Sequence, residues 1–271
     1  ADYEIVFNGK NIEFHPINKS TAFLYTSSKR ASLAEWFQDE SPIIRFEDTS
    51  IMEFNELFQP KIERVPYDIS KIASWNWTGV DLSTESQYKK HKNPTRLERQ
   101  ENSIQRHVIN QLIGGWKMDY DIIFDDDGKG EISDIVALKA HGDQFHVHLF
   151  HCKYSQSSDA GARVGDFYEV CGQAQKSVYW RSRSKQLFDR LKLREQTRLN
   201  MYGISRFEKG SLQLLDELRR RSRVLTPKFE IFIIQPGLLT TRVDGQILDL
   251  LGATELYLTE TFAVPLTVIA S

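Results

Sequence analysis

The sequence predicts an α/β fold in which a helix, three strands, a second helix and a further strand follow one another. Residues 95–113 place apolar side chains at helical spacing and stop at Gly114 and Gly115. Three apolar segments divided by short polar turns come next, at residues 119–124, 131–140 and 142–154. A long helix or a broken pair of helices is expected over 166–195, and residues 228–237 are nearly all apolar, as in the middle strand of a sheet covered on both faces.

A small mixed α+β domain is expected in front of this core. Asn8-Gly9 is typical of a hairpin turn, and Ser32 with Glu35 predicts a capped short helix. A polar stretch without periodicity then ends at Asn93-Pro94. The sequence therefore predicts two domains, 1–92 and 93–271, and the first contains no recognisable chemistry.

Composition describes an ordinary globular chain. Of its 271 residues, 40% are hydrophobic and 27% are charged, and no apolar run is long enough to span a bilayer. The first residues lack the features of a signal peptide, and two cysteines cannot form a disulfide framework. We therefore expect a cytoplasmic protein without a membrane partner.

Charge is unevenly distributed although the net charge is only -2. Residues 34–60 contain seven acidic side chains against one arginine, and residues 176–198 contain eight basic side chains against two acidic ones. This segregation fits a face that binds a polyanion, although amphipathic helices also expose lysine and arginine simply for solvation.

The segment "LFHCKYS", residues 149–155, carries the strongest chemical signal. Strand alternation places His151 and Lys153 on one face, at the end of an apolar strand. A buried ammonium needs a partner, and Asp134 in the apolar "ISDIVAL" has the same need. If the two strands are neighbours, we expect Asp134 to meet His151 and Lys153. The flanking helices add Gln175 with Tyr179, four residues apart on one helix face, and Glu101 beside the first apolar stripe.

Together these motifs resemble the PD-(D/E)XK nucleases, which have the restriction-endonuclease-like fold, and in particular their RecB-like and Mrr-like branches. "GEISDIVALK" is similar to the aspartate strand of that family, "HLFHCKYS" to its (D/E)-x-K strand, and "QKSVY" to its Gln-x-x-x-Tyr motif. The resemblance covers about residues 95–235. It implies a metal-dependent DNA endonuclease, an effector part of a larger anti-phage defence or DNA-processing protein linked to a helicase or another domain, and it allows an oligomer.

The resemblance also implies roles for individual residues. Asp134, the residue at 151 and the backbone carbonyl of Cys152 would coordinate a divalent cation, which activates water and stabilises charge on the phosphate. Lys153 would orient the nucleophile, and Gln175 and Tyr179 would position the strand that is cut. Glu101 falls where many members have an acidic residue.

The sequence departs from the family at His151, where a glutamate or aspartate is usual. Imidazole suits Mn²⁺ better than Mg²⁺, so Mn²⁺ is favoured over Mg²⁺ if His151 is a ligand. Alternatively His151 acts as a base, or the domain binds DNA without cutting it. A further alternative is a working metal site whose missing carboxylate comes from another acidic residue, which would be Glu101, Asp125, Asp126, Asp127 or Glu131.

A basic face is expected to hold the DNA backbone without reading its sequence. Its residues are Arg181, Arg183, Lys185, Arg190 and Lys192. The main alternative function is a non-catalytic module for DNA binding or assembly. A weaker alternative is a zinc-stabilised interaction domain that uses His146 and His148, which share a strand face.

Overall fold

The computed structural model describes residues 2–7, 12–17, 22–27, 29–40, 42–46, 50–53, 56–59, 65–91, 93, 96–155 and 164–271. The chain divides into two compact units, residues 1–63 and residues 64–271, and each unit is described by itself.

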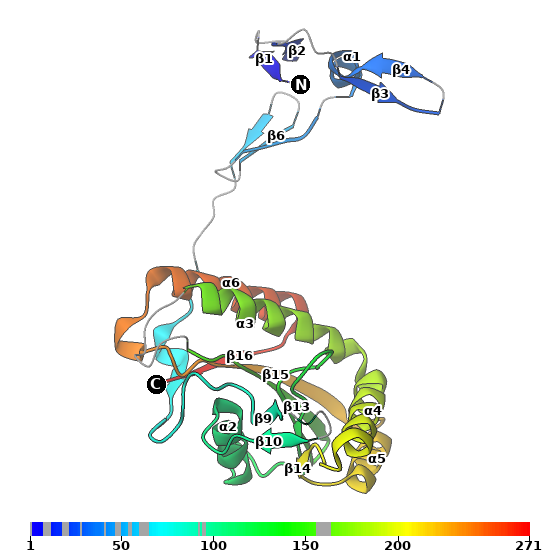
Figure 1. The fold of residues 1–271 in the computed structure, drawn as a ribbon. Helices are drawn as coiled ribbons and strands as arrows, with labels where there is room; N and C mark the ends of the chain where they lie inside the picture. Colours follow the sequence, from blue (N-terminus) through cyan, green and yellow to red (C-terminus); the bar gives the residue numbers. More distant parts are fainter. Residues whose placement is uncertain are drawn as a thin grey trace. The chain divides into compact units, whose positions relative to one another are not determined.

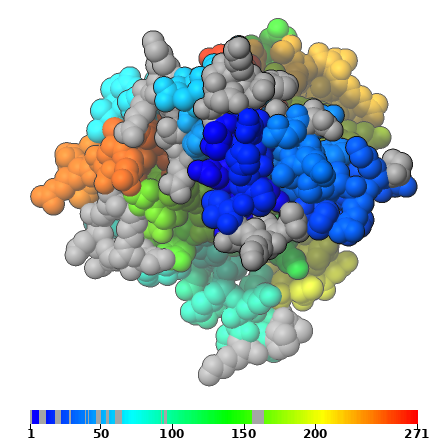
Figure 2. Space-filling model, turned by 90° about the horizontal axis from the view of Figure 1, so that it is seen from above, coloured from blue at the N-terminus to red at the C-terminus, as the bar shows by residue number. Residues whose placement is uncertain are grey.

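The first unit consists of short antiparallel pairs around one helix. Its elements are β1 (Tyr3–Phe7), β2 (Ile12–Pro16), β3 (Phe23–Tyr25), β4 (Arg30–Ser32), α1 (Leu33–Asp39), β5 (Ile44–Arg45), β6 (Ile51–Glu53) and β7 (Glu56–Phe58). The capping box of Ser32 and Glu35 starts α1 as the sequence predicts. Phe37 of α1 packs against Tyr3 and Phe14. Figure 2 shows the dark-blue residues of β1 and β2 beside the mid-blue part of the chain that contains α1. The predicted Asn8-Gly9 turn lies outside the described residues.

The predicted domain boundary at 92/93 differs from the division at 63/64. β8 (Ile72–Ser74) pairs in parallel with β16 (Leu266–Ala270), the strand that ends the second unit. Trp77 is buried, and its Nε1 donates a 3.0 Å hydrogen bond to the carbonyl of Ala270. The polar composition of this stretch suggested a domain boundary, but Ile72 and Trp77 are core residues of the second unit.

A mixed sheet forms the centre of the second unit. Within the described residues it has seven strands, in the order β14 (Phe207–Lys209), β11 (Ile122–Asp125), β12 (Ile135–His141), β13 (Gln144–Cys152), β15 (Thr226–Ile234), β16 and β8. The strands from β14 to β13 are antiparallel neighbours, whereas β13, β15, β16 and β8 run parallel. The register sets Ile135 opposite Phe150, so the start of β12 lies beside the end of β13.

Helices cover both faces of this sheet. α2 (Ile104–Ile113) packs on one face together with Trp77. The other face carries α3 (Val164–Ser177), α4 (Ser184–Tyr202), α5 (Leu212–Arg221) and α6 (Gly245–Phe262). Figure 1 shows α3 and α6 side by side above the sheet, with α2 on the opposite side. The remaining elements are β9 (Tyr88–Lys90), β10 (Leu97–Arg99) and the 3₁₀ turns η1 (Ile69–Lys71), η2 (Val178–Ser182) and η3 (Thr240–Arg242).

The predicted α/β class is confirmed. The elements α2, β11, β12, β13, α3 and β15 occur in the order that the sequence predicts, with α4, β14 and α5 between α3 and β15. Of the two expectations for residues 166–195, the structure has the broken pair, because α3 ends at Ser177 and α4 begins at Ser184 after η2. In the part of the chain that the structure describes, no helix is long and apolar enough to cross a membrane.

Candidate functional site

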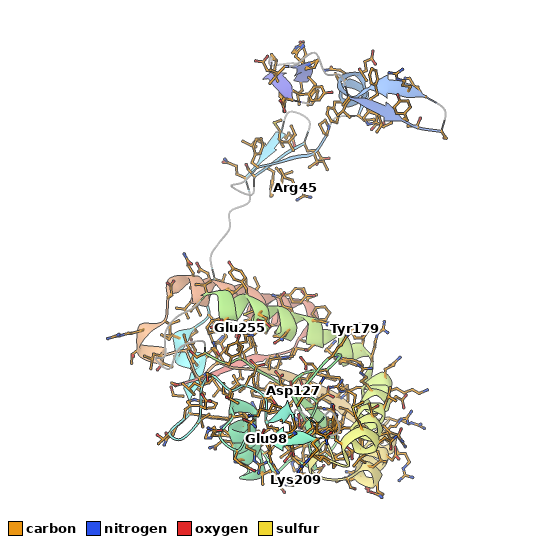
Figure 3. All side chains as sticks on the ribbon, in the orientation of Figure 1. Arg45, Glu98, Asp127, Tyr179, Lys209 and Glu255 are labelled. Carbon is orange, nitrogen blue, oxygen red and sulfur yellow. The ribbon has the colours of Figure 1, made fainter. Side chains whose placement is uncertain are left out.

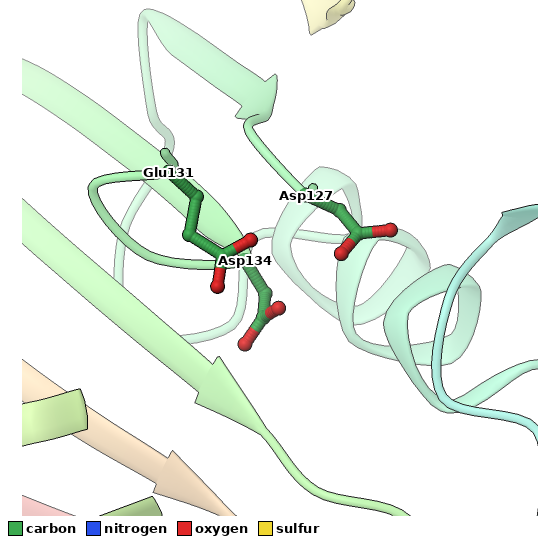
Figure 4. A group of neighbouring side chains, drawn as sticks. All are labelled: Asp127, Glu131 and Asp134. Carbon is green, nitrogen blue, oxygen red and sulfur yellow. The ribbon is translucent and has the colours of Figure 1, made fainter. Parts of the chain in front are cut away.

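The turn between β11 and β12 gathers carboxylates. Gly128 and Gly130 adopt positive φ angles of 108° and 81°, which glycine tolerates without steric cost. The backbone N–H of Gly128 donates a 2.7 Å hydrogen bond to the Glu131 carboxylate and holds it against the turn. Among the described residues, Asp127, Glu131 and Asp134 then offer carboxylate oxygens that all lie within 4.8 Å of one another. Figure 4 shows these three side chains, here called the acidic cluster, extending from different parts of the turn into one space.

Asp134 is the most firmly held member of the acidic cluster. Its Oδ2 accepts a 2.8 Å hydrogen bond from the backbone N–H of Cys152, at the end of β13. Its Oδ1 accepts a 3.2 Å hydrogen bond from Nε2 of Gln105, which is fully buried on α2. Each carboxylate oxygen has two acceptor positions, so both keep capacity for a further partner. The start of β12, the end of β13 and α2 thus position Asp134.

The electrostatics of the acidic cluster are unfavourable to its own negative charge. Burial raises the pKa of Asp134 well above its ordinary value, and repulsion from Glu131 and Asp127 raises it further. Burial is also the main cause that raises the pKa values of Asp127 and Glu131. These three carboxylates lie close together, Asp134 is buried, and Asp134 and Glu131 accept hydrogen bonds from backbone N–H groups. Such a group of oxygen donors matches the ligand set of a hard divalent cation. The acidic cluster can therefore bind a metal ion.

Lys153 is the first residue after β13, next in sequence to Cys152, whose backbone N–H donates a hydrogen bond to Asp134. Its Nζ donates a 2.6 Å hydrogen bond to Glu169 of α3, and the lysine side chain is 8% exposed against 58% for the glutamate. Burial opposes the charge of Lys153, but the hydrogen bond and the nearby carboxylate of Glu85 leave its pKa raised. Glu85 accepts a 3.0 Å hydrogen bond from the backbone N–H of Tyr154, and burial raises its pKa.

His151 does not join the acidic cluster, which corrects the expectation that it is a metal ligand. Its Nε2 lies 2.7 Å from Oγ of Ser177 on α3, on the face of the sheet opposite α2. That hydroxyl lies 2.9 Å from the carbonyls of Ile132 and Gln173, to which its one hydrogen can be donated, so Nε2–H of His151 donates to Oγ. Burial lowers the pKa of His151 to about 3, so it is neutral and a weak base near neutral pH.

The preference for Mn²⁺ loses its basis with this correction, because it depended on imidazole as a ligand. A set of carboxylates suits Mg²⁺ as well as Mn²⁺. Cys152 contributes its backbone N–H to the site, whereas its thiol is buried in the core and has a pKa raised well above the ordinary value by burial.

Gln175 and Tyr179 lie near the acidic cluster but not on one helix. Gln175 is on α3, and its Nε2 donates a 3.3 Å hydrogen bond to Thr254 of α6. Tyr179 is in η2 and is 49% exposed. Both line a pocket of about 730 Å³ that also contains Glu131. Figure 3 labels Tyr179 of η2 and Asp127 of the turn between β11 and β12 in the second unit.

The other predicted acidic residues have structural partners. Glu101 is exposed and pairs with Arg99 and Arg106, at 3.5 and 3.4 Å. Gln105, one turn further along, is the residue of this helix region that reaches Asp134. Asp125 pairs with Arg198 at 2.5 Å, and buried Asp126 pairs with Arg194.

The predicted basic face is only partly available. Arg181, Arg183 and Lys185 are exposed, and the Arg183 guanidinium lies 4.0 Å from the ring centre of Tyr179. Arg190 instead donates from Nε to the carbonyl of Gly130 at 3.2 Å, and Lys192 pairs with Asp216 at 2.9 Å.

The zinc site proposed for His146 and His148 finds no support. Nδ1 of His148 lies 2.7 Å from the Tyr120 hydroxyl, and burial lowers the pKa of His148 to about 3. Among the described residues, the group of ligand type that forms is the acidic cluster, without histidine or cysteine.

Sequence reasoning missed Glu85, Glu169 and the role of Gln105, and it treated Asp127 and Glu131 only as substitutes. The signal for Asp127 and Glu131 was the acidic, glycine-containing turn "DDDGKGE" next to the aspartate strand.

Comparisons of the chain with protein-family models, with curated proteins and with solved structures gave no match.

Proposed function

We propose that the second unit is a metal-dependent nuclease domain that hydrolyses phosphodiester bonds in DNA. The observation that carries the proposal is the meeting of buried Asp134 with the strand end that bears Lys153, beside Asp127 and Glu131. The order α2, β11, β12, β13, α3 and β15 supports a restriction-endonuclease-like core. The predicted ligand set is revised from Asp134, His151 and the Cys152 carbonyl to Asp127, Glu131 and Asp134.

These carboxylates would hold Mg²⁺ or Mn²⁺, which supplies a Lewis acid to polarise the phosphate and lower the pKa of water. The chain's own groups prepare the site. Gln105 and the Cys152 N–H orient Asp134, as hydrogen bonds behind a ligand commonly do. Glu169 keeps Lys153 protonated at Nζ, so its positive charge can stabilise negative charge that develops on a phosphate.

A non-catalytic DNA-binding module remains the second candidate, because one observation favours it. Position 151 carries a neutral histidine that is directed toward Ser177, and Lys153 is engaged by Glu169. In such a module the paired charges of Lys153 and Glu169 would serve stability alone. DNA would be bound by the exposed arginines of η2 and the start of α4.

Cleavage of plasmid and single-stranded DNA with Mg²⁺ and with Mn²⁺ tests the proposal. We expect Asp134→Asn and Lys153→Ala each to reduce cleavage by about 100-fold or more. Asp119→Asn is the matched control, because Asp119 is an exposed aspartate, paired with Lys209, that makes no contact with the acidic cluster. Cleavage that persists in Asp134→Asn would overturn the nuclease proposal at this site, and DNA binding without cleavage by any variant would favour the second candidate.

A further inference from the structure

A second pocket, of about 480 Å³, adjoins the acidic cluster on the side of α4 and the β9–β10 pair, and Asp127 lines it. Its charged lining contains more cations than carboxylates. The cations are Lys90, Lys129, Arg190, Arg194, Arg198 and Arg206, and the carboxylates are Asp125 and Asp127. This basic pocket therefore attracts anions next to a site that repels them.

Two of these arginines hold the turn of the acidic cluster. Arg194 pairs with Asp126 and donates to the carbonyl of Lys129 at 3.0 Å. Arg206 donates from Nη1 to the carbonyls of Asp125 and Asp127, at 2.8 and 3.1 Å. Their hydrogen-bonding groups are largely used by the protein itself.

Arg198 is different, although its side chain is only 5% exposed. Its Nη1 contacts Asp125, but Nε and Nη2 are buried without a hydrogen-bond partner among the described residues. The guanidinium lies 4.3 Å from the ring centre of Tyr88, which also lines the basic pocket. Buried donors without partners cost free energy and are rare in folded proteins, so they indicate a missing acceptor.

The basic pocket also has an apolar wall. Leu193 and Met201 of α4 line it, and each is 54% exposed. Exposed apolar side chains that face a cationic wall match the two parts of a nucleotide, an anionic phosphate and an apolar base surface.

We propose that the basic pocket binds one nucleotide of a nucleic-acid strand, with its phosphate at Arg198 and Lys90 and its sugar or base at Leu193 and Met201. This inference rests on the proposed nuclease function. The nucleic-acid strand would then pass from the basic pocket to the acidic cluster along Asp127, which lines the pocket and belongs to the cluster.

Fluorescence anisotropy with a labelled short oligodeoxythymidylate tests the inference, with Ca²⁺ replacing Mg²⁺ to prevent turnover. Lys90→Ala removes an exposed cation of the basic pocket. Lys89→Ala is the matched control, because Lys89 is the neighbouring lysine of β9 and pairs with Glu98 of β10 at 3.5 Å. We expect Lys90→Ala to weaken binding by about tenfold. It should also flatten the slope of log K against log salt by about 0.7, while Lys89→Ala resembles the wild type. Leu193→Ser should weaken binding without changing the salt slope.

The competitors thymidine 5′-monophosphate, thymidine and inorganic phosphate identify what the basic pocket recognises. The monophosphate should displace the oligonucleotide better than the other two. Equal displacement by inorganic phosphate would overturn the nucleotide assignment, and equal binding by Lys90→Ala and Lys89→Ala would overturn the basic pocket as the strand path. If either of these two results is obtained while cleavage still depends on Asp134, the nuclease proposal is unaffected and only the basic-pocket inference fails. Absence of all oligonucleotide binding by the wild type would overturn this inference.

Discussion

The backbone N–H of Cys152 donates a 2.8 Å hydrogen bond to Oδ2 of Asp134, and this contact draws Asp134 to the side of the sheet that faces Gln105 of α2. Strand alternation sends the neighbouring His151 side chain to the opposite face, where it contacts Ser177 of α3. Asp134 and His151 therefore serve different parts of the protein, although each is next in sequence to a member of the β12–β13 pair Ile135 and Phe150.

Replacement of His151 separates these roles. His151→Gln keeps a polar group for Ser177, and we expect cleavage and metal affinity within about threefold of the wild type. His151→Glu restores the usual acidic residue of the resembled motif, but its charge would be buried without a cationic partner, so we expect a loss of about 3–5 kcal/mol in the free energy of unfolding. Chemical denaturation and a cleavage assay measure both effects. A gain of activity in His151→Glu would contradict the placement of this side chain.

The metal-free protein should lose stability as pH rises. Burial and repulsion from Glu131 raise the pKa of Asp134 above its ordinary value of 3.8. The folded state then holds a proton that the unfolded chain releases, so the free energy of unfolding falls with pH above 3.8, until the folded carboxyl is also ionised.

We therefore expect a lower Tm in EDTA at about pH 8 than at about pH 5.5, and a larger rise in Tm on adding Mg²⁺ at the higher pH. Thermal unfolding followed by circular dichroism measures both. Asp134→Asn removes this carboxyl and should reduce the difference in Tm between the two pH values. A wild-type Mg²⁺ effect that is equal at both pH values would contradict the account.

Glu169 should tune Lys153 rather than act directly. Its hydrogen bond helps raise the pKa of Lys153, so Glu169→Gln should lower that pKa. If Lys153 acts as its protonated form, the alkaline limb of the pH–rate profile will move to lower pH, with little change at the optimum. Glu255→Gln is a control, because Glu255 pairs with Lys71 elsewhere in the unit. An unchanged alkaline limb would show that the charge of Lys153 does not limit the rate.

The second unit should fold alone only if it keeps residues 64–92. Trp77 and β8 complete its core and its sheet, and the loss of a buried tryptophan side chain alone typically costs about 3–5 kcal/mol. We expect the fragment 64–271 to unfold cooperatively in denaturant and the fragment 93–271 not to. Cooperative unfolding of both would favour the boundary predicted from the sequence.

Periodicity predicted the core because α2, β11, β12, β13 and β15 each have a regular apolar pattern. It failed at residues 64–92, where Ile72, Tyr67 and Trp77 are core residues separated by polar turns without a period. Pairing of β8 with β16 joins residues far apart in the sequence, which no local pattern reveals.

The part of the site that was predictable from the sequence is the pairing of the two strands that carry it. The start of β12 and the end of β13 meet as expected, since antiparallel neighbours bring one start and one end together. Asp134 accepts its hydrogen bond from the backbone N–H of Cys152, however, and not from the side chains of His151 or Lys153, which contact Ser177 and Glu169 instead. The sequence did not predict that Asp134 and His151 lie on opposite sides of the sheet, because Asp134 precedes β12 and turns toward Gln105. The inclusion of Asp127 and Glu131 depends on turn geometry around Gly128 and Gly130, which spacing alone does not specify.

Calorimetric titration of the metal-free protein with Mn²⁺ tests the central claim, that Asp127, Glu131 and Asp134 form a metal centre without His151. The wild type and His151→Gln should bind Mn²⁺ alike, whereas Asp134→Asn and Glu131→Gln should each lose most of the binding heat. Full binding by Asp134→Asn, or loss of binding in a folded His151→Gln, would contradict the claim.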